Sequence, residues 1–321
     1  MSDKDKEKYV LPRELEDLPG IGEATAERLR KAGYTEVQQI AVANPHELAE
    51  AGDYGVEAAK KSIEAAKEAI HTGFESADII LERRKDIKRI PTGSKAFDEL
   101  LGGGVETQAI TECFGKFSSG KSQVGFQLAV NAQEALSNGS GPVRVLFIDT
   151  ESTFRPERIV QIAEGKGMDP QQVMKNILVA KAENSDHQMI LLEKAEDTIK
   201  NENVKLIIID SLTSHFRADY MGRGALSERQ QKLNKHIHML QKYADKYNLS
   251  IYVTNQVMDN PAILFGDPTT PIGGHVLAHA ATYRIYLRKS KESRRIARLI
   301  DSPNLPEGEA VFKVSTDGIG D

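Results

Sequence analysis

The chain has 321 residues, of which 40% are hydrophobic and 28% are charged, and its formal net charge is −5. These values are ordinary for a globular protein, and the length allows one large domain and a small one. No apolar run approaches the roughly 18 residues of a membrane span, the charged N-terminus has no apolar signal core, and Cys113 is the only cysteine. The composition therefore predicts no membrane segment and no internal disulfide framework, and it favours the reducing cytoplasm. The acidic balance does not exclude a nucleic-acid partner, because binding depends on local patches of charge.

The N-terminal part predicts a charged, disordered tail at residues 1–12 and a compact helical domain at residues 13–71. Within that domain, two short helices flank the turn Leu18-Pro-Gly-Ile-Gly22. This arrangement resembles a helix-hairpin-helix, in which backbone N–H groups around Gly20 and Gly22 would hold a DNA phosphate. The alternative is that the turn merely caps its helices. A weaker second turn contains Asp53, which would repel phosphate.

A linker at residues 72–89 follows, and it contains the aromatic residue Phe74. The segment is too short to own a core, so Phe74 either packs on its own domain or inserts into a neighbouring subunit. From residue 90 to residue 321, strand patterns alternate with helix patterns. This alternation predicts an α/β domain with a mainly parallel sheet covered by helices.

A phosphate-binding loop opens this second domain. A β-branched, apolar stretch at residues 109–114 leads into Gly115-Lys-Phe-Ser-Ser-Gly120-Lys121-Ser122, and a helix pattern follows. Strand, G-x-x-x-x-G-K-[ST] and helix together are the pattern of a loop whose backbone N–H groups surround phosphates. Lys121 would reach the β- and γ-phosphates, and the Ser122 hydroxyl would bind Mg²⁺. The predicted nucleotide ligands are Gly115, Lys116, Phe117, Ser118, Ser119, Gly120, Lys121, Ser122 and Gln123.

Polar residues stand at the ends of three further predicted strands. These strands cover residues 143–149, 206–210 and 250–254. Because carboxyl ends of parallel strands share one edge of the sheet, Glu151, Asp210 and Gln256 should meet the nucleotide there. Asp210 would hold the hydration shell of Mg²⁺, Glu151 would polarise the attacking water, and Gln256 would sense the γ-phosphate. With Lys121, the expected catalytic residues are Glu151 and Gln256.

Two long connections are candidates for contacts with a polynucleotide. Residues 216–224 place Arg217 and Arg223 among glycines, and Arg229 follows shortly after. Such a loop can become ordered around a phosphate backbone. Residues 257–281 are rich in Gly and Pro and contain His275 in a Gly-Gly-His sequence on the γ-phosphate side. The C-terminal part predicts an antiparallel meander with a basic hairpin tip at residues 289–295, interpreted as solvated.

Taken together, these motifs closely resemble those of the archaeal RadA recombinases and their eukaryotic homologues, within the RecA-fold ATPases. The resemblance covers about residues 14–321. The motifs that carry it are Leu18-Pro-Gly-Ile-Gly22, Phe74-x-x-Ala77, residues 115–122, Ile148-Asp-Thr-Glu151, Phe154-Arg-Pro-Glu-Arg158, Asp210-Ser-Leu-Thr-Ser-His-Phe-Arg217, Gly222-Arg223, Arg229-Gln-Gln, Asn255-Gln256, Gly273-Gly-His275 and Asp301-Ser-Pro303.

The resemblance implies a RecA-like P-loop ATPase core and ATP-dependent homologous pairing and strand exchange, in recombination and double-strand break repair. Its implied partners are single- and double-stranded DNA, further copies of the chain in a helical filament or ring, and recombination mediators, in the nucleoid of the cytoplasm. It casts Phe74 and Ala77 as a polymerisation motif that enters a neighbouring ATPase core. Two loops are implied to bind DNA: the first is near Arg217 to Arg229, and the second runs from Val257 to about Ala280 and includes Gly273 and Gly274.

The resemblance also adds residues to the nucleotide site. It implies that Arg155 and Arg158 lie near the nucleotide and that His275 senses the γ-phosphate across a subunit interface. Asp301 and Pro303 match a cap that closes over the neighbour's nucleotide. The chain departs from the family at Ser118 and Ser152, where the family usually has Gly. Ser118 loses freedom for positive φ, and Ser152 adds a hydroxyl beside Glu151, so turnover is the property we expect these residues to alter.

Two other classes compete with a recombinase. An accessory paralogue would sense ATP and load a recombinase without exchanging strands, but such paralogues typically lack the N-terminal helical domain or the polymerisation motif. A hexameric RecA-fold helicase would translocate as a ring. That class does not account for the motif Phe74-x-x-Ala77. Strand-exchange assays test the first alternative, and unwinding of a forked duplex tests the second.

Overall fold

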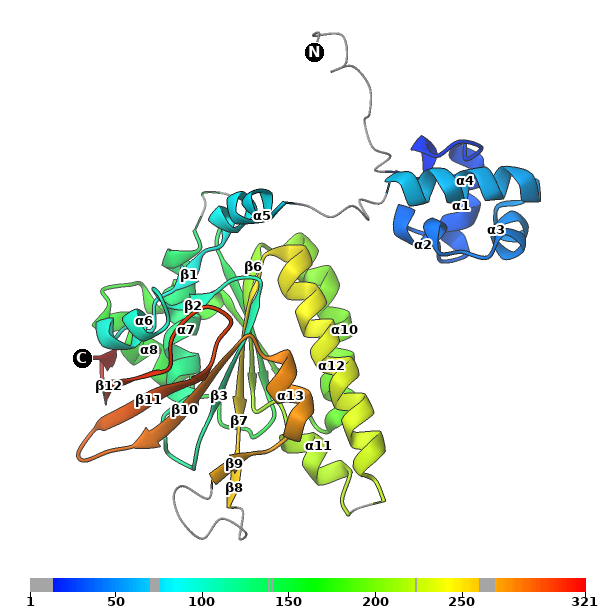
Figure 1. Ribbon diagram of the computed structural model, residues 1–321. Coiled ribbons are helices and arrows are strands. Elements are labelled where there is room, and N and C mark those ends of the chain that lie inside the picture. The colour runs from blue at the N-terminus through cyan, green and yellow to red at the C-terminus, as the bar shows by residue number, and fades with distance from the viewer. Residues whose placement is uncertain (1–13, 70–75, 138, 140, 223, 260–268) are drawn as a thin grey trace. The chain divides into compact units, whose positions relative to one another are not determined.

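The computed structural model describes residues 14–321 apart from 70–75, 138, 140, 223 and 260–268. The chain divides into two compact units, Met1–Glu82 and Arg83–Asp321 (Figure 1).

The first unit is helical where it is described. Its elements are η2 Leu15–Asp17, α1 Glu23–Lys31, α2 Val37–Ala41, α3 Pro45–Gly52 and α4 Val56–Ala69. Helix α5 Ala77–Arg83 follows and ends at the first residue of the second unit. Leu18, Leu29, Ile40 and Leu48 are buried in one apolar core. Local chemistry sets the ends of α3, because the Asn44 side chain accepts a hydrogen bond from the next turn's backbone and Asp53 closes the helix at φ 52°.

A nine-stranded sheet forms the centre of the second unit, in the order β13-β12-β11-β10-β3-β7-β6-β4-β5. The strands are β3 Ala109–Phe114, β4 Arg144–Asp149, β5 Ile177–Lys181, β6 Val204–Asp210, β7 Ser250–Asn255, β10 Tyr283–Lys289, β11 Arg294–Asp301, β12 Gly308–Ser315 and β13 Gly318–Gly320. Strands β5, β4, β6, β7, β3 and β10 run parallel, and β10 to β13 form antiparallel pairs. The mainly parallel sheet and the antiparallel meander are both confirmed.

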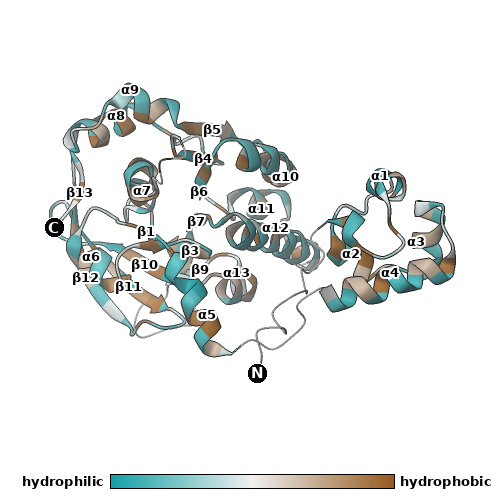
Figure 2. Ribbon diagram, turned by 90° about the horizontal axis from the view of Figure 1, so that it is seen from above, coloured by the Kyte–Doolittle hydropathy of each residue, from teal (hydrophilic) through white to brown (hydrophobic). Residues whose placement is uncertain are grey.

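Helices cover both faces of the sheet, as Figure 2 shows. They are α6 Lys95–Leu100, α7 Lys121–Ala135, α8 Pro156–Gly165, α9 Pro170–Lys175, α10 Ser185–Asn201, α11 Ser214–Asp219, α12 Leu226–Tyr247 and α13 Gly274–Ala280. Successive strand residues point to opposite faces. Thus Ile208 joins the core under α7 and α8, whereas Ile207 and Ile209 join the core under α10 and α12. This double burial explains why the central strands are apolar throughout.

The two connections expected to be irregular contain regular structure. Helix α11 includes Phe216 and Arg217, so the first connection is helical at its start. The second contains the antiparallel pair β8 Val257–Asp259 and β9 Thr269–Pro271 and then α13. Two shorter elements, η3 Arg84–Asp86 and the pair β1 Arg89–Ile90 and β2 Val105–Glu106, lie at the start of the unit. No helix in the described part of the chain is long and apolar enough to cross a membrane.

Candidate nucleotide site

The phosphate loop connects the end of β3 to the first residue of α7. A Cβ atom at Gly115 would collide with the carbonyl oxygen of Leu287, and Gly120 has φ 109°, so both positions need glycine. Lys121 Nζ donates hydrogen bonds to the carbonyl oxygens of Gly115, at 2.9 Å, and Lys116, at 3.2 Å. The loop therefore curls around the amine of its own lysine. Burial lowers the pKa of Lys121, which is close to the acidic groups Asp210 and Glu151.

Two serines in the site have left-handed backbones. Ser118 in the phosphate loop has φ 60°, and Ser152, next to Glu151, has φ 58°. These are the two positions at which the resemblance described above implies glycine. Residues with a Cβ atom are strained in this region of backbone space, whereas glycine is not. Ser118 therefore adopts the positive φ that we expected to be unfavourable for serine at this position.

Asp210 ends β6 beneath the phosphate loop and is 3% exposed. Its Oδ1 accepts a hydrogen bond from the Thr254 hydroxyl, and the Ser122 hydroxyl lies nearby. Burial raises the pKa of Asp210, and the Ser122 and Thr254 hydroxyls oppose the rise. Oδ2 is buried and has no hydrogen-bond partner among the described residues. A buried carboxylate oxygen beside Ser122 is suited to the water shell of Mg²⁺.

Glu151 and Gln256 are joined across the site. Gln256 Nε2 donates to Glu151 Oε1 at 2.6 Å, and the Ser211 hydroxyl donates to the same oxygen at 2.9 Å. The turn that carries Glu151 is held from below by Asp149, whose carboxylate accepts from the backbone N–H groups of Glu151, Thr153 and Phe154. Position and orientation of Glu151 are therefore set by three strands.

These groups line one cavity of about 750 Å³. Its lining contains Gly115, Lys116, Phe117, Ser118, Ser119, Gly120, Lys121, Ser122, Gln123, Glu151, Arg158, Asp210 and Gln256. The structure thus brings together the predicted loop and the predicted strand-end residues. A separate cavity of about 910 Å³ is lined by Gly93, Asp98, Gln127 and Gly318 among others, and none of the predicted site residues lines it.

The two arginines named by the resemblance differ in their placement. Arg158 lines the cavity, and its guanidinium donates to Gln123 Oε1 at 2.7 Å and to the Ser315 carbonyl at 2.7 Å. Arg155 instead donates to the carbonyl oxygens of Ser152, at 3.2 Å, and Phe154, at 2.8 Å. Arg155 does not line the cavity.

Arg295 is a cavity residue that sequence reasoning missed. Its position in the chain suggests the solvated hairpin tip, but it lines the cavity, and a Cβ at Gly120 would lie 3.6 Å from its Cγ. Its Nε is buried with no partner in the described structure. Only the strand topology indicates that Arg295 reaches the cavity, because β11 returns antiparallel to β10 and β10 runs parallel to β3. The first residues of β11 must then lie beside the loop that follows β3.

Some predicted residues do not reach this cavity. Asp301 pairs with Arg284 near the start of β10, whereas Arg295 pairs with Lys289 at its end, so Asp301 and Pro303 lie toward the opposite edge of the sheet. Both are exposed. Phe74, Arg223 and the side chain of His275 lie outside the described residues. Ala77 is described, and it begins α5 with its side chain exposed.

Residues next to the first connection and within the second meet at Asn255, which is fully buried. Its Oδ1 accepts from the Thr213 hydroxyl at 2.7 Å, and its Nδ2 donates to Glu112 Oε1 at 2.7 Å and to the Ile272 carbonyl. Glu112 is itself paired with Arg284 at 2.7 Å. Asn255, one residue before Gln256, therefore ties the segment that leads into the first connection and the residue after β9 in the second to the centre of the sheet.

The expected DNA-contacting residues of the two connections differ in their exposure. Arg217 is exposed on α11, and Arg229 is half-buried on α12. Gly273 has φ 102° and precedes Gly274 at the N-terminus of α13, and Gln230 Nε2 donates to the Gly273 carbonyl at 3.4 Å.

In the N-terminal unit, Gly20 has φ 86°, Gly22 caps α1, and the Ser62 hydroxyl holds the turn by donating to the Pro19 carbonyl at 2.7 Å. The turn between η2 and α1 is therefore fixed against α4.

The fold and this cavity define a RecA-like P-loop ATPase joined to a helix-hairpin-helix region. Residues 83–321 match the family model described as Rad51, and residues 12–68 match the model described as a SAM-like helix-hairpin-helix tandem. The first match covers more than half of the chain, so the chain belongs to the Rad51 family. Membership implies a RecA-like recombinase role in recombination and repair, DNA binding, self-oligomerisation, and a DNA-dependent ATPase activity that uses ATP and Mg²⁺.

Proposed function

We propose that this chain is a strand-exchange recombinase that assembles on single-stranded DNA as a filament, with ATP bound between adjacent copies. The observation that carries this proposal is the hydrogen bond from Gln256 to Glu151. It connects the residue suited to polarise water with the strand end from which the second glycine-rich connection starts. ATP state and the state of that connection can therefore influence each other.

The residues of the cavity fit a nucleoside triphosphate with Mg²⁺. The loop N–H groups and Lys121 would bind the phosphates, and Ser122 with Asp210 would hold the ion, which supplies charge neutralisation at the β- and γ-phosphates. Glu151 would orient and polarise the attacking water. Arg158 and Arg295 lie on the side of the cavity formed by Gln123 and Ser315, where they would contact the rest of the nucleotide.

Contacts with DNA are assigned to the two connections. Arg217, Arg223 and Arg229 would bind phosphates from the first, and the backbone at Gly273 and Gly274 would approach the strand from the second. The helix-hairpin-helix turn at Gly20 and Gly22 would hold a further phosphate. Such contacts do not read bases, so we expect weak sequence dependence and a strong salt dependence.

Assembly would use residues from both ends of the second unit and from the linker. Phe74 and Ala77 would enter a neighbouring core, and β5 is an edge strand of the sheet that could accept an added strand. Asp301 and Pro303 would close over the neighbour's nucleotide, and His275 and Arg155 would act at the same seam. The proposed organisation is a tail at residues 1–12, a DNA-binding domain at 13–71, a linker at 72–89 and the ATPase core at 90–321.

One experiment tests the proposal against its competitors. The full-length chain is incubated with ATP, Mg²⁺, single-stranded DNA and homologous duplex, and the joint and exchanged products are measured. We expect exchange, and no unwinding of a forked duplex without homology. ATP-dependent assembly without exchange would indicate the accessory class, in which the chain loads a mediator-dependent recombinase. Unwinding of the fork would indicate a helicase.

A further inference from the structure

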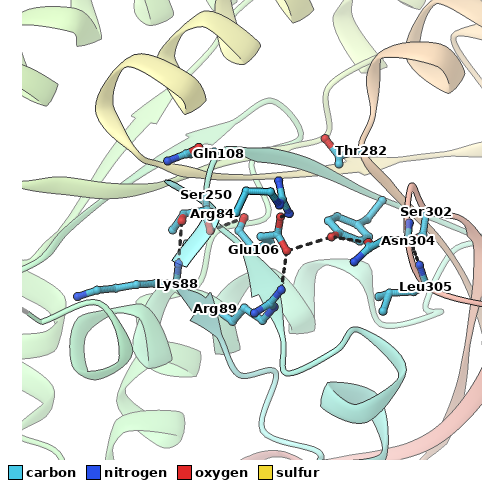
Figure 3. A network of polar contacts seen from close by, with 12 residues as sticks. Arg84, Lys88, Arg89, Glu106, Gln108, Ser250, Thr282, Ser302, Asn304 and Leu305 are labelled. Atoms are coloured by element: carbon cyan, nitrogen blue, oxygen red, sulfur yellow. Dashed lines mark hydrogen bonds and ion pairs between the residues drawn. The ribbon is translucent and has the colours of Figure 1, made fainter. Parts of the chain in front are cut away.

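A buried carboxylate organises the edge of the sheet that lies away from the nucleotide cavity. Glu106 on β2 is 3% exposed, and it accepts hydrogen bonds from Arg84 Nη2 at 2.7 Å and Arg89 Nη2 at 2.8 Å (Figure 3). The strand that leads from this edge to the phosphate loop, β3, has six residues and is about 20 Å long. The cluster of Arg84, Arg89, Glu106, Tyr283 and Asn304, which we call the Glu106 hub, is thus remote from the catalytic groups.

One arm of the hub reaches the chain as it enters the ATPase unit. Residues 88–90 are already fixed by backbone, since Thr107 N donates to the Lys88 carbonyl at 2.9 Å and β1 pairs with β2. Arg84 precedes this pairing and opens η3, directly after α5. Its guanidinium binds one oxygen of Glu106, and that of Arg89 binds the other. Charge-assisted hydrogen bonds to a buried carboxylate are strong, so the orientation of the segment at Arg84 depends on Glu106.

The other arm reaches the turn after β11. The Tyr283 hydroxyl lies 3.1 Å from Glu106 Oε2 and 3.3 Å from Asn304 Oδ1. Both oxygens are acceptors, so the single hydroxyl proton is shared between them and holds the Asn304 side chain beside Glu106. Burial and the nearby Glu106 raise the pKa of Tyr283 to about 12, which keeps the proton in place. The turn itself is closed by the Ser302 hydroxyl, which accepts from the Asn304 and Leu305 backbones at 3.2 and 2.8 Å (Figure 3).

We propose that Glu106 is a positioning residue for self-assembly, which holds the end of the linker at Arg84 and the turn at residues 302–305 in one fixed arrangement for a second copy of this chain. The proposal rests on the proposed function, in which residues 74–77 and 301–303 contact neighbouring copies. Those two segments are more than 200 residues apart in sequence. Fixing them before they meet a neighbour lowers the entropy lost on binding and makes the two contacts cooperative.

The chain offers a matched pair of variants for the test. Arg84→Gln and Arg89→Gln each remove one positive charge that is paired with the Glu106 carboxylate. The two arginine side chains are similarly exposed, at 48% and 37%. Only Arg84 lies before the backbone pairing that fixes residues 88–90, on the side of the linker that carries residues 74–77. With ATP, Mg²⁺ and single-stranded DNA, we expect Arg84→Gln to raise the protein concentration of half-assembly, measured by sedimentation, by about three- to tenfold, against less than about twofold for Arg89→Gln. Tyr283→Phe, which cuts the other arm, should behave like Arg84→Gln.

A second readout separates positioning from general damage. ATP affinity at protein concentrations below assembly should be the same in wild type and in all three variants, since the hub does not touch the cavity. Equal shifts from the two arginine variants, no shift from Arg84→Gln while wild type assembles, or a fall in unassembled ATP affinity would each overturn the positioning role. A wild-type chain that never assembles would instead contradict the proposed function on which this role rests.

Discussion

Gln256 Nε2 donates a 2.6 Å hydrogen bond to Glu151 Oε1, and this contact links two strands that β6 separates in the sheet. On one side of the bond lies the carboxylate at the phosphate loop. On the other, the Gln256 carbonyl accepts from Ile272 N at 3.0 Å, directly after β9 in the second connection. A change at the γ-phosphate that breaks or remakes the Gln256–Glu151 bond would therefore affect the start of that connection and the residue that follows β9.

Replacing Gln256 by Glu should uncouple DNA from hydrolysis. Two carboxylates at this distance repel, so the bridge to Glu151 would be lost while the phosphate loop keeps its nucleotide contacts. We expect the stimulation of ATP hydrolysis by single-stranded DNA to fall by about 5- to 150-fold, with ATP affinity changed little. The measurement is steady-state phosphate release with and without DNA, with Gln241→Glu, half-buried on α12 and not part of the cavity lining, as the control. If DNA stimulates ATP hydrolysis by Gln256→Glu as strongly as in wild type, the Gln256–Glu151 hydrogen bond does not couple DNA binding to hydrolysis.

The two left-handed serines predict gains in stability. Ser118→Gly and Ser152→Gly should each raise the free energy of unfolding by about 0.5–1 kcal/mol, because glycine adopts φ near 60° without strain. Thermal melting of the ATPase unit measures the effect. Ala195→Gly, inside α10, is the control and should cost about 1 kcal/mol, since there glycine replaces a good helix former. A loss of stability in both serine variants would mean that the serine side chains contribute more than the strain costs.

His236 predicts a stability that depends on pH. It is fully buried beside Phe216, and burial lowers its pKa from 6.5 to about 4. Below pH 6.5, His236 binds a proton in the unfolded chain but stays neutral in the native chain. The free energy of unfolding should therefore fall as the pH drops toward 4. The slope from this group approaches about 1.4 kcal/mol per pH unit. Chemical denaturation of wild type and His236→Gln between pH 7 and pH 4 gives the comparison, with the exposed His46→Gln as control. The same slope in wild type and His236→Gln would rule out this origin.

Arg217→Ala should weaken binding to single-stranded DNA without unfolding the chain, because Arg217 is exposed on α11. One lost phosphate contact should also reduce the slope of log affinity against log salt by about 0.7. Fluorescence anisotropy over a range of salt concentrations measures both quantities, with Lys175→Ala on α9 as a control of equal charge. If Arg217→Ala and Arg229→Ala both bind like wild type, the DNA site lies elsewhere.

Local patterns were enough to predict the sheet and the phosphate loop. Glycine at residues 115 and 120, Lys121 and Ser122 lie within eight residues, and strand periodicity on either side fixes their context. The strand-end residues Glu151, Asp210 and Gln256 followed from one further rule, that parallel strands end at a common edge. For these residues the sequence was enough to predict both the kind of side chain in the site and its position in the fold.

Features that depend on tertiary pairing were not predictable in the same way. Arg295 looked like part of a solvated tip because its place beside Gly120 depends on the register of β11. Helix α11 and the β8–β9 pair lie in segments whose glycines and prolines suggest irregular structure, yet they pack on residues distant in sequence. Glu106 gave no signal at all, because its partners are recruited from segments about 20 and 180 residues away.

The rate of ATP hydrolysis, measured across a range of protein concentrations with and without single-stranded DNA, tests the central claim most directly. The Lys121→Ala variant lacks the amine that is proposed to bind the phosphates, so its rate serves as the background. If nucleotide is bound at the seam between copies and its γ-phosphate sets the state of the two DNA-contacting connections, the rate per chain will rise with protein concentration and rise again with DNA. A rate that is the same at every concentration and unaffected by DNA would contradict the account.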